Sequence, residues 1–387
     1  MLSPLKSKVY RVLAFIFLSL FPVLGFSNTA SCADYVRVGI IKDVPSLSLK
    51  VSGFYQAWDD AAHKLLYRSK NLKVTLTAFG DGGISFGGKN FNCSRVLIKP
   101  LDEDAIVING RRFRGDVLII KITGAGLSVI NYVEIDDYVK GVLYHEASHY
   151  WPQEALKAQA IACRTFALYQ TLENKTRDYD VTSDVYSQVY GGRTSERYRI
   201  SRIVEGTRGK VITYRGDIFP AYYHATCAGH TEDASLLWKI NLAPLRGVVC
   251  PFCQGSPHFS WNAVLSCVEI RDKLNGAGYP LKEVKDIVIL SRDKSARIKS
   301  LKIITDNKEI IMPAKDFRSI VGFNIIRSTN FKVRLEGGDV IFTGLGWGHG
   351  VGLCQWGAYF MAKEGYDYRQ IIGYYYPGSL ISAYKPR

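Results

Sequence analysis

The chain has 387 residues, of which 47% are hydrophobic and 22% are charged, and its formal net charge is +15. This composition excludes a disordered chain, and the length allows one large domain or two of ordinary size. The positive charge favours an anionic partner, such as an acidic envelope polymer or a membrane surface, although it also promotes simple solubility. Nucleic acid is not expected, because the chain has no zinc-finger spacing, no RNP-like string and no dense Lys/Arg run.

Residues 1–33 have the pattern of a secretory signal peptide. Three cations precede an apolar run from Val12 to Phe26, and small residues follow as far as Ala33. The run contains Pro22 and is shorter than the roughly 20 residues that a membrane span needs. We therefore expect cleavage near Ala33 and export to the periplasm or cell envelope; a retained membrane anchor is the alternative. Cleavage would remove three positive charges and lower the net charge to about +12.

From residue 34 to about residue 133, apolar and polar residues mostly alternate, which predicts a β-rich N-terminal part. The strings "YVRVGII", "LSLKV" and "LKVTLTA" carry this pattern. Asn109 and Gly110 lie between two such runs, and this pair favours the tight turn of a β-hairpin.

After this part the apolar spacing becomes that of helices. Asp136 or Asp137 is suited to cap a short helix that runs to Glu146. Pro152 is suited to begin a second helix, "PQEALKAQAIACRTFALYQTL". In the second helix, apolar residues at i, i+4, i+7 and i+11 predict one buried stripe, made of Leu156, Ala160, Cys163 and Ala167.

A small α/β module is expected at residues 267–330, where an amphipathic segment precedes two β-branched runs. Residues 34–266 plus 331–387 would form the main domain around this insertion. The main domain should contain the β-rich N-terminal part, the central helices, and a Gly-rich strand with helices at the C-terminus. The predicted fold class is therefore α+β.

The string "HEASH" at residues 145–149 fits H-E-x-x-H, in which two histidines on one helical face bind zinc and the glutamate is a general base. Pro152 opposes this interpretation, because the residue before a proline is pushed out of helical geometry. The helix should then end between Glu146 and Trp151, so His145 and His149 would not share a face. Glu146 is then either a solvated residue at a helix end or a general acid whose pKa is raised by aromatic neighbours.

Glycines occupy every second position of "GLGWGHGVG", at residues 344, 346, 348, 350 and 352. In an extended strand this spacing leaves one face without side chains, where a flat sugar ring has room to approach the backbone. Tight packing of the strand against a helix is the alternative. The opposite face of the strand would carry Leu345, Trp347, His349 and Val351.

Eight cysteines are too few for a disulfide scaffold in a chain of this length. Cys250 and Cys253, in "CPFC", are spaced to bind one metal ion or to close a small disulfide ring. With Cys227, and with His258 or His230 as the fourth ligand, they fit a structural zinc site. A disulfide between two of these cysteines is the alternative in an oxidising envelope.

Five strings occur in consistent order over nearly all of the chain after the signal: "EIDDYVKGVLYHEASHYWPQEALKAQAIACRTFALYQ", "DVYSQVYGG", "YYHATCAGHTEDA", "SPHFSW" and "GWGHGVGLCQWGAYFMAKEGYDYRQIIGYYYPG". Together they resemble the stage II sporulation protein D (SpoIID) family, whose relatives include the LytB-type amidase enhancers. In that family the glutamate of an E-M-x-x-x-W-P-like segment is the catalytic acid of a lytic transglycosylase, and Glu146 holds its position. Ala147 stands where the family usually has methionine. Some members bind zinc through cysteines just ahead of Q-x-Y, but Thr182 and Ser187 stand at those places in this sequence.

The resemblance implies a peptidoglycan enzyme that cleaves the bond between N-acetylmuramic acid (MurNAc) and N-acetylglucosamine (GlcNAc) during division or sporulation. One carboxyl group is enough for this reaction: it protonates the linking oxygen and then deprotonates the muramyl 6-hydroxyl, so that a 1,6-anhydro ring closes. No cofactor is required. Glycan stripped of its stem peptides is the expected substrate, because its regular lactyl carboxylates suit a basic protein.

A non-catalytic glycan-binding enhancer of an N-acetylmuramoyl-L-alanine amidase is the alternative function. In both cases glycan strands and a cell-wall amidase are the expected partners. The cleft residues expected beside Glu146 offer hydrogen bonds or aromatic rings to a sugar, and one cation to a carboxylate. They are Arg164, Gln188, Tyr190, His224, Thr226, Trp347, His349, Gln355 and Trp356.

Overall fold

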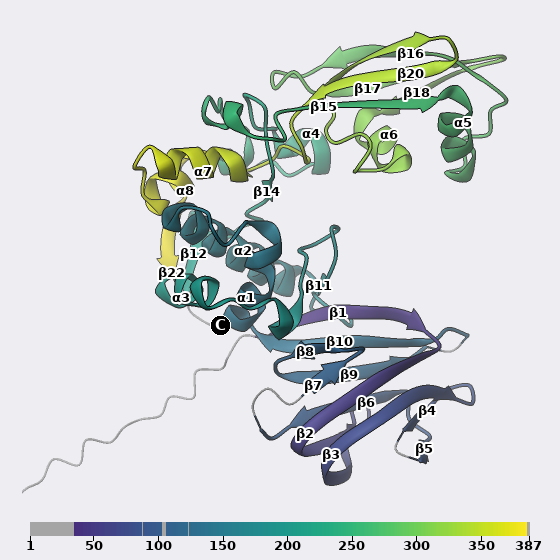
Figure 1. Cartoon of the computed structure of the whole chain (residues 1–387), viewed down its shortest axis with the longest axis vertical. Helices are drawn as coiled ribbons and strands as arrows, with labels where there is room; N and C mark the ends of the chain where they lie inside the picture. The colour runs from purple at the N-terminus through teal and green to yellow at the C-terminus, as the bar shows by residue number, and fades with distance from the viewer. Residues whose placement is uncertain (1–34, 87, 103–105, 123, 385–387) are drawn as a thin grey trace, which may run out of the picture. The chain divides into compact units, whose positions relative to one another are not determined.

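The computed structural model describes residues 35–86, 88–102, 106–122 and 124–384 (Figure 1). Within these ranges the chain forms eight α-helices and 22 β-strands, which confirms the expected mixture of helices and strands. None of these helices is both long enough and apolar enough to span a membrane. The predicted signal peptide, residues 1–33, lies outside the described residues.

The β-rich N-terminal part is one large sheet, drawn mainly in purple and blue in Figure 1. Its strands are β1 (Tyr35–Val44), β2 (Ser46–Asp59), β3 (Lys64–Phe79), β4 (Gly83–Phe86), β5 (Lys89–Phe91), β6 (Arg95–Pro100), β7 (Ile106–Ile108), β8 (Arg111–Phe113), β9 (Asp116–Lys121), β10 (Leu127–Glu134) and the later β11 (Val181–Thr182). The order is β11-β1-β10-β9-β6-β2-β3-β4-β5, with β7 paired to β2 and β8. All pairs are antiparallel except β1 with β11.

The sequence pattern accounts for this sheet locally. In β2, buried Leu47, Leu49 and Val51 alternate with exposed neighbours, so one face packs on the core and the other meets solvent. Asn109 and Gly110 connect β7 to β8, and both have positive φ, 45° and 80°. Two positive φ angles are what a type I′ hairpin turn needs, so the predicted turn is confirmed.

Two helices follow the sheet. α1 (Ile135–Glu146) starts directly after β10, and α2 (Gln153–Glu173) follows after a short loop. Asp136 and Asp137 therefore lie in the first turn of α1, whereas the sequence pattern predicted one of them as its cap. α3 (Tyr198–Gly206) packs against both helices.

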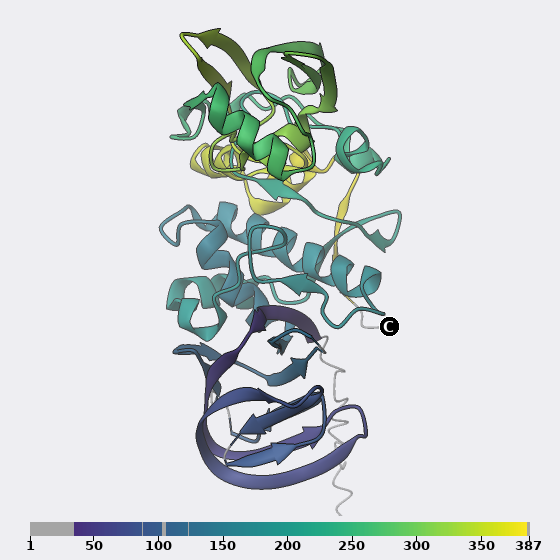
Figure 2. The same cartoon turned by 90° about the vertical axis from the view of Figure 1, so that its right-hand side faces the viewer.

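Helix α2 is buried on two sides. The predicted stripe of Leu156, Ala160, Cys163 and Ala167 is fully buried in a core shared with the sheet and α1, as expected. On its other side, Ala158, Ile161 and Ala162 enter a second core. The second core is completed by C-terminal residues, and the yellow helices α7 (Gln355–Lys363) and α8 (Tyr368–Tyr375) lie beside α2 in both views (Figures 1 and 2).

Short elements complete this second core. They are the strand β12 (Lys210–Tyr214) with its edge partner β13 (Asp217–Ile218), the strands β14 (Tyr223–His224), β21 (Leu353–Cys354) and β22 (Leu380–Ala383), the helix α4 (Ala234–Trp238), and the 3-10 turns η2 (Ala243–Leu245) and η3 (Phe252–Gly255). Another 3-10 turn, η1 (Gly192–Ser195), packs against α1 and β8. β14 and β21 pair in parallel, which places the Gly-rich segment beside the "YYHATC" segment. β22 pairs with β12, so the end of the described chain returns to α2.

A third hydrophobic core lies within residues 260–345, the region that contains the predicted α/β module. Its elements are β15 (Ser260–Ser266), α5 (Cys267–Gly276), β16 (Val284–Arg292), β17 (Ile298–Thr305), β18 (Glu309–Pro313), α6 (Ala314–Val321), β19 (Phe331–Glu336) and β20 (Asp339–Leu345). Trp261, Val340 and Phe342 belong to this core. This core thus includes residues of β15, β19 and β20, on either side of residues 267–330, and the module boundaries at 267 and 330 stay a prediction.

Candidate active site around Glu146

Glu146 is the last residue of α1. Ala147 has extended backbone angles, φ −146° and ψ 142°, so α1 ends at Glu146. This agrees with the end between Glu146 and Trp151 that Pro152 predicted. His149 lies beyond the helix end, where its ring packs between Tyr144 and Tyr150. The two histidines of "HEASH" thus share no helical face.

His145 has a different partner. One of its ring nitrogens lies 2.6 Å from the hydroxyl of Ser195. Loss of hydration, together with the charges of Arg111 and Arg197, lowers the pKa of His145. Among the residues that the structure describes, the only His, Cys, Asp and Glu side chains that converge as metal ligands are four cysteines. The geometry therefore gives no support to a zinc-protease site at residues 145–149.

The carboxyl group of Glu146 is enclosed by protein, although the residue as a whole is only partly buried. Loss of hydration raises its pKa from 4.5 to about 7. Hydrogen bonds from the backbone N–H of Val189 (3.1 Å to Oε1), from Gln355 and from Tyr223 oppose this shift. Loss of hydration dominates, so near neutral pH the group can both donate and accept a proton.

A row of aromatic rings begins at Trp151, five residues after Glu146. Trp151 packs on Trp356 at 5.0 Å and on Tyr359 at 5.2 Å between ring centroids. His258 lies between Trp356 (6.2 Å) and Trp347 (4.7 Å). All five rings are partly exposed, and we call them the aromatic strip. Such rings offer flat apolar faces with polar edges, which suit the faces of a sugar.

Cations accompany the aromatic strip. The guanidinium of Arg327 lies 4.5 Å from the ring centre of Trp347. Arg197 lies over the ring of Tyr144, and Arg199 donates a hydrogen bond to the carbonyl of Trp151. Arg197 and Arg199 are exposed, so they are available to an anionic ligand near Glu146.

Gln355 and Trp356 begin helix α7; Gln355 contacts Glu146 directly, and Trp356 contacts Trp151 of the loop after Glu146. The side-chain nitrogen of Gln355 donates to the backbone carbonyl of Glu146 at 3.0 Å. Trp356 belongs to the aromatic strip through its contact with Trp151. Neither contact was evident from spacing, because more than two hundred residues separate the partners.

Four other predicted cleft residues lie in the interior, each with no more than 4% of its surface exposed. Gln188 accepts from the hydroxyl of Tyr138 and donates to the hydroxyl of Tyr223. The hydroxyl of Tyr190 donates to the side chain of Asn131, and a ring nitrogen of His224 bonds the carbonyl of Val351. Thr226 shares a hydrogen bond with the hydroxyl of Ser256. These side chains position the segments around Glu146, and they present no surface to a glycan.

The two histidines of this region are neutral. Burial and the nearby Arg297 lower the pKa of His224 to about 3. His349 packs against Trp238 at 5.0 Å, and loss of hydration of its ring holds its pKa far below the usual value. His349 lines a pocket of about 130 Å³ that also contains Tyr223, the neighbour of Glu146.

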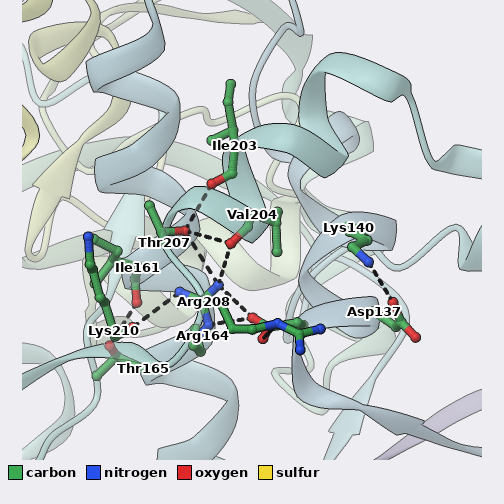
Figure 3. Close-up of polar contacts among 11 residues, drawn as sticks. Asp137, Lys140, Ile161, Arg164, Thr165, Ile203, Val204, Thr207, Arg208 and Lys210 are labelled. Carbon is green, nitrogen blue, oxygen red and sulfur yellow. Dashed lines mark hydrogen bonds and ion pairs between the residues drawn. The ribbon is translucent and has the colours of Figure 1, made fainter. Parts of the chain in front are cut away.

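The substrate-binding role predicted for Arg164 is wrong. It was expected to bind a substrate carboxylate, but its side chain is completely buried in α2. Its guanidinium pairs with Asp136 at 2.7 Å. It also donates hydrogen bonds to the backbone carbonyls of Lys210 and Val204, as Figure 3 shows. A charge of this kind is stable in the interior only when it is paired and hydrogen-bonded, so Arg164 joins α1 to α2 and α3.

The Gly-rich segment also differs from expectation. β20 ends at Leu345, and Gly346, Gly348, Gly350 and Gly352 all have positive φ, so the segment is no regular strand. A Cβ atom at any of these positions would clash with protein atoms. At Gly346 and Gly352 it would meet the backbone carbonyls of Thr226 and Tyr222, and at Gly348 and Gly350 the side chains of His224 and Arg297. The bare face is filled by protein backbone and side chains, which leaves no room for a sugar ring.

The cysteine cluster has a different fourth member from the one predicted. Cys227, Cys250 and Cys253 converge with Cys354, and the four sulfurs lie within 4.8 Å of one another. His258 instead packs in the aromatic strip, and His230 bonds the carbonyl of Thr231. Cys354 lies 101 residues after Cys253, so spacing alone gave no sign of it.

Comparison with known proteins defines the class. The family model described as stage II sporulation protein matches residues 123–214, which include Glu146, Gln188 and Tyr190. A second model, for a domain of unknown function (DUF8618), matches residues 253–352 and thus spans the α/β module. The chain belongs to the stage II sporulation protein D family.

Three relatives illustrate this membership. An uncharacterised protein of Brachyspira hyodysenteriae is 37% identical over 363 residues, which cover 94% of this chain and 95% of the relative. Stage II sporulation protein D of Bacillus subtilis is 30% identical over 273 residues, 67% of this chain and 77% of the relative. The amidase enhancer of Bacillus subtilis is 26% identical over 294 residues, 64% of this chain but 40% of the relative.

Proposed function

We propose that the chain is an exported lytic transglycosylase that cleaves the MurNAc–GlcNAc bond of peptidoglycan, with Glu146 as its acid and base. The observation that carries the proposal is the state of this carboxyl group. The pKa of this group is raised to about 7, Glu146 as a residue is only partly buried, and Trp151 of the adjoining loop begins the aromatic strip. A general acid that later acts as a base needs such a pKa near neutral pH.

The reaction uses this one carboxyl group twice. In the first step Glu146 donates its proton to the linking oxygen, and the bond from that oxygen to C1 of MurNAc breaks. In the second step the 6-hydroxyl of the same MurNAc attacks C1 and gives its proton to the Glu146 carboxylate. The products are a 1,6-anhydro-MurNAc end and a free GlcNAc 4-hydroxyl, no water is consumed, and the enzyme regains its proton.

The neighbours of Glu146 support this double role. The Val189 N–H stabilises the carboxylate that exists between the two steps, while loss of hydration keeps the protonated form accessible. Gln355 fixes the backbone of Glu146, so the carboxyl group is held in one place. Trp151 and Trp356 provide a platform on which a sugar next to the broken bond is able to stack.

The substrate we propose is glycan without stem peptides. Each disaccharide of such glycan carries one lactyl carboxylate, and the region near Glu146 presents the exposed guanidinium groups of Arg197 and Arg199. These two arginines replace Arg164 as the proposed carboxylate partners. The net charge of +15 favours encounter with an anionic polymer in the cell envelope.

The amidase enhancer of Bacillus subtilis favours a second candidate function. In this candidate the same aromatic strip binds glycan without cleaving it, and the chain assists an N-acetylmuramoyl-L-alanine amidase. Both candidates use the same glycan-binding surface, and they differ in whether Glu146 performs chemistry.

Product analysis separates the two candidates. Purified protein is incubated with denuded glycan and, in parallel, with intact peptidoglycan, and the products are identified by mass spectrometry. The transglycosylase predicts products with 1,6-anhydro ends and no incorporation of oxygen from H₂¹⁸O. Glycan that stays uncleaved, while an added amidase works faster, would refute the enzyme and favour the enhancer.

A further inference from the structure

The four-cysteine cluster lies on segments that are far apart in the sequence. Cys227 follows β14, Cys250 and Cys253 flank the start of η3, and Cys354 ends β21 at the beginning of α7. All four side chains are buried, and their sulfurs lie within 4.8 Å of one another. The sulfurs of Cys227 and Cys253 are 3.5 Å apart.

This spacing fits a metal ion at the centre. A tetrahedral Zn²⁺ with Zn–S bonds of about 2.3 Å places its sulfurs roughly 3.8 Å from one another. A covalent S–S bond, at about 2.05 Å, is much shorter than the 3.5 Å separation of Cys227 and Cys253. The C-x-x-C spacing of Cys250 and Cys253 is common among zinc ligands, and all four positions of a tetrahedron are filled by sulfur.

The surroundings of the sulfurs fit thiolates rather than a simple apolar core. The backbone N–H groups of Cys227 and Gly357 both point at the sulfur of Cys354, each at 3.3 Å. Cys354 is the N-cap of α7, where the partial positive charge of the helix end favours an anion. The hydroxyl of Tyr375 lies 3.1 Å from the sulfur of Cys250. Donors of this kind orient and stabilise metal-bound sulfur.

We propose that Cys227, Cys250, Cys253 and Cys354 bind one Zn²⁺ ion in a closed structural site. With four protein ligands the ion has no free position for water or substrate, so its role is to hold the chain together. It joins the "HATC" segment, the "CPFC" turn and the start of α7 in a region of short elements with little regular sheet. Ligation also keeps the thiols from forming disulfides.

The site has a direct link to Glu146. Gln355, which bonds the carbonyl of Glu146, is the residue after Cys354. His258 of the aromatic strip follows Cys253 by five residues. The zinc ion therefore fixes both the amide that positions Glu146 and one end of the aromatic strip. The proposal does not depend on transglycosylase activity, because its tests measure metal and thiols.

Metal analysis of purified protein tests the proposal. Protein produced with zinc in the medium and purified without chelators or a metal-affinity tag should contain about one zinc per chain by mass spectrometry. Cys354→Ser should lose most of this zinc. Cys267→Ser, which changes a cysteine of α5 outside the cluster, is the matched control and should retain it. Full zinc content in Cys354→Ser would overturn the proposal.

A second pair of measurements covers the case in which Cys354→Ser does not fold. Cys253→His exchanges one zinc ligand for another, so it should keep zinc and fold. In the wild type, a strong chelator should release the zinc and lower Tm by on the order of 10 °C. After denaturation without reductant, all cysteines of the chain should react as free thiols. Protein without zinc that shows two or four thiols fewer would establish disulfides in place of the metal site.

Discussion

The side-chain amide of Gln355 donates a 3.0 Å hydrogen bond to the backbone carbonyl of Glu146, a residue 209 positions earlier in the chain. The last carbonyls of a helix have no partner within the helix, and this bond satisfies one of them at the end of α1. It also ties the residue that we propose as acid and base to the first residue of α7. The position of Glu146 therefore depends on C-terminal residues.

Glu146→Gln should abolish cleavage while leaving the fold intact. The amide is nearly isosteric with the carboxyl group, but it neither donates an acidic proton nor accepts one from the 6-hydroxyl. General acid–base catalysis contributes on the order of 10² to 10⁴-fold, and one group serves both steps, so the loss should reach about 10⁴-fold. Quantification of anhydro ends measures it. Two controls should retain activity: Glu173→Gln, at an exposed glutamate of α2, and His149→Ala. Near wild-type production of anhydro ends by Glu146→Gln would contradict the assignment.

The rate should depend on pH through the same group. The acid step needs protonated Glu146, whose pKa is raised to about 7. Above this pH the protonated fraction falls about tenfold per pH unit, so kcat/KM should decline with that slope. Initial rates of anhydro-end formation between pH 5 and 9 give the profile. A rate that stays constant up to pH 9 would mean that the titration of Glu146 does not limit the reaction.

The same pKa shift predicts how stability changes with pH. The carboxyl group loses its proton near pH 4.5 in the unfolded chain and near pH 7 in the folded chain. Between these values the folded state binds more protons, so the stability contributed by Glu146 falls as pH rises through this window.

Glu146→Gln removes the titration and should become more stable relative to wild type from pH 4.5 to 7. The gain is up to about 3 kcal/mol and is constant above pH 7. Because Glu146 as a residue is partly exposed, this figure is an upper bound. Urea unfolding at pH 4, 6 and 8 measures the difference. A difference that does not change with pH would show that the folded and unfolded pKa values are alike.

Arg164 should matter for stability and not for the chemistry. Arg164→Met leaves Asp136 buried without its closest partner, at a cost of roughly 3 kcal/mol or more. Arg208→Ala is the matched control: Arg208 also pairs with Asp136, at 3.4 Å, but 66% of its side chain is exposed. Its loss should cost less than about 1 kcal/mol. Denaturant unfolding gives both values. An Arg164→Met protein of wild-type stability but weaker glycan binding would restore the original assignment.

The aromatic strip should determine how tightly glycan binds. Trp356→Ala removes the ring that contacts Trp151 and should raise KM roughly tenfold, which corresponds to about 1.4 kcal/mol of lost binding energy. Trp58→Ala changes another partly buried tryptophan, in β2 of the N-terminal sheet, and serves as control. Michaelis profiles with glycan fragments of fixed length provide KM. An unchanged KM in Trp356→Ala would exclude stacking on this ring.

Local signals in the sequence predicted much of the fold. Asn109 and Gly110 favour their turn through their own backbone preferences. The apolar stripe of α2 follows from the helical spacing of its residues. The end of α1 at Glu146 follows from the nearby Pro152. In each case the residues that decide the structure are close neighbours in the chain.

The remaining features depend on contacts between residues that are far apart in the sequence, and local sequence spacing does not reveal such contacts. Cys354 reaches the other cysteines only because β14 and β21 pair in parallel. Arginine is usually found at the surface, and the burial of Arg164 depends on its ion pair with Asp136 from another helix. The alternating glycines suggest a strand, but their positive φ angles arise from close approach of the "YYHAT" segment.

Helix α2 belongs to two cores at once, one with the sheet and one with the C-terminal helices. If either core opened, one side of α2 would be exposed to water, and the other core would lose part of its packing. We therefore expect the amide hydrogens in the middle of α2 to exchange with solvent only through global unfolding. The loop that carries Trp151 joins α1 to α2, so we expect the region around Glu146 to be held by an element that opens only when the whole chain unfolds.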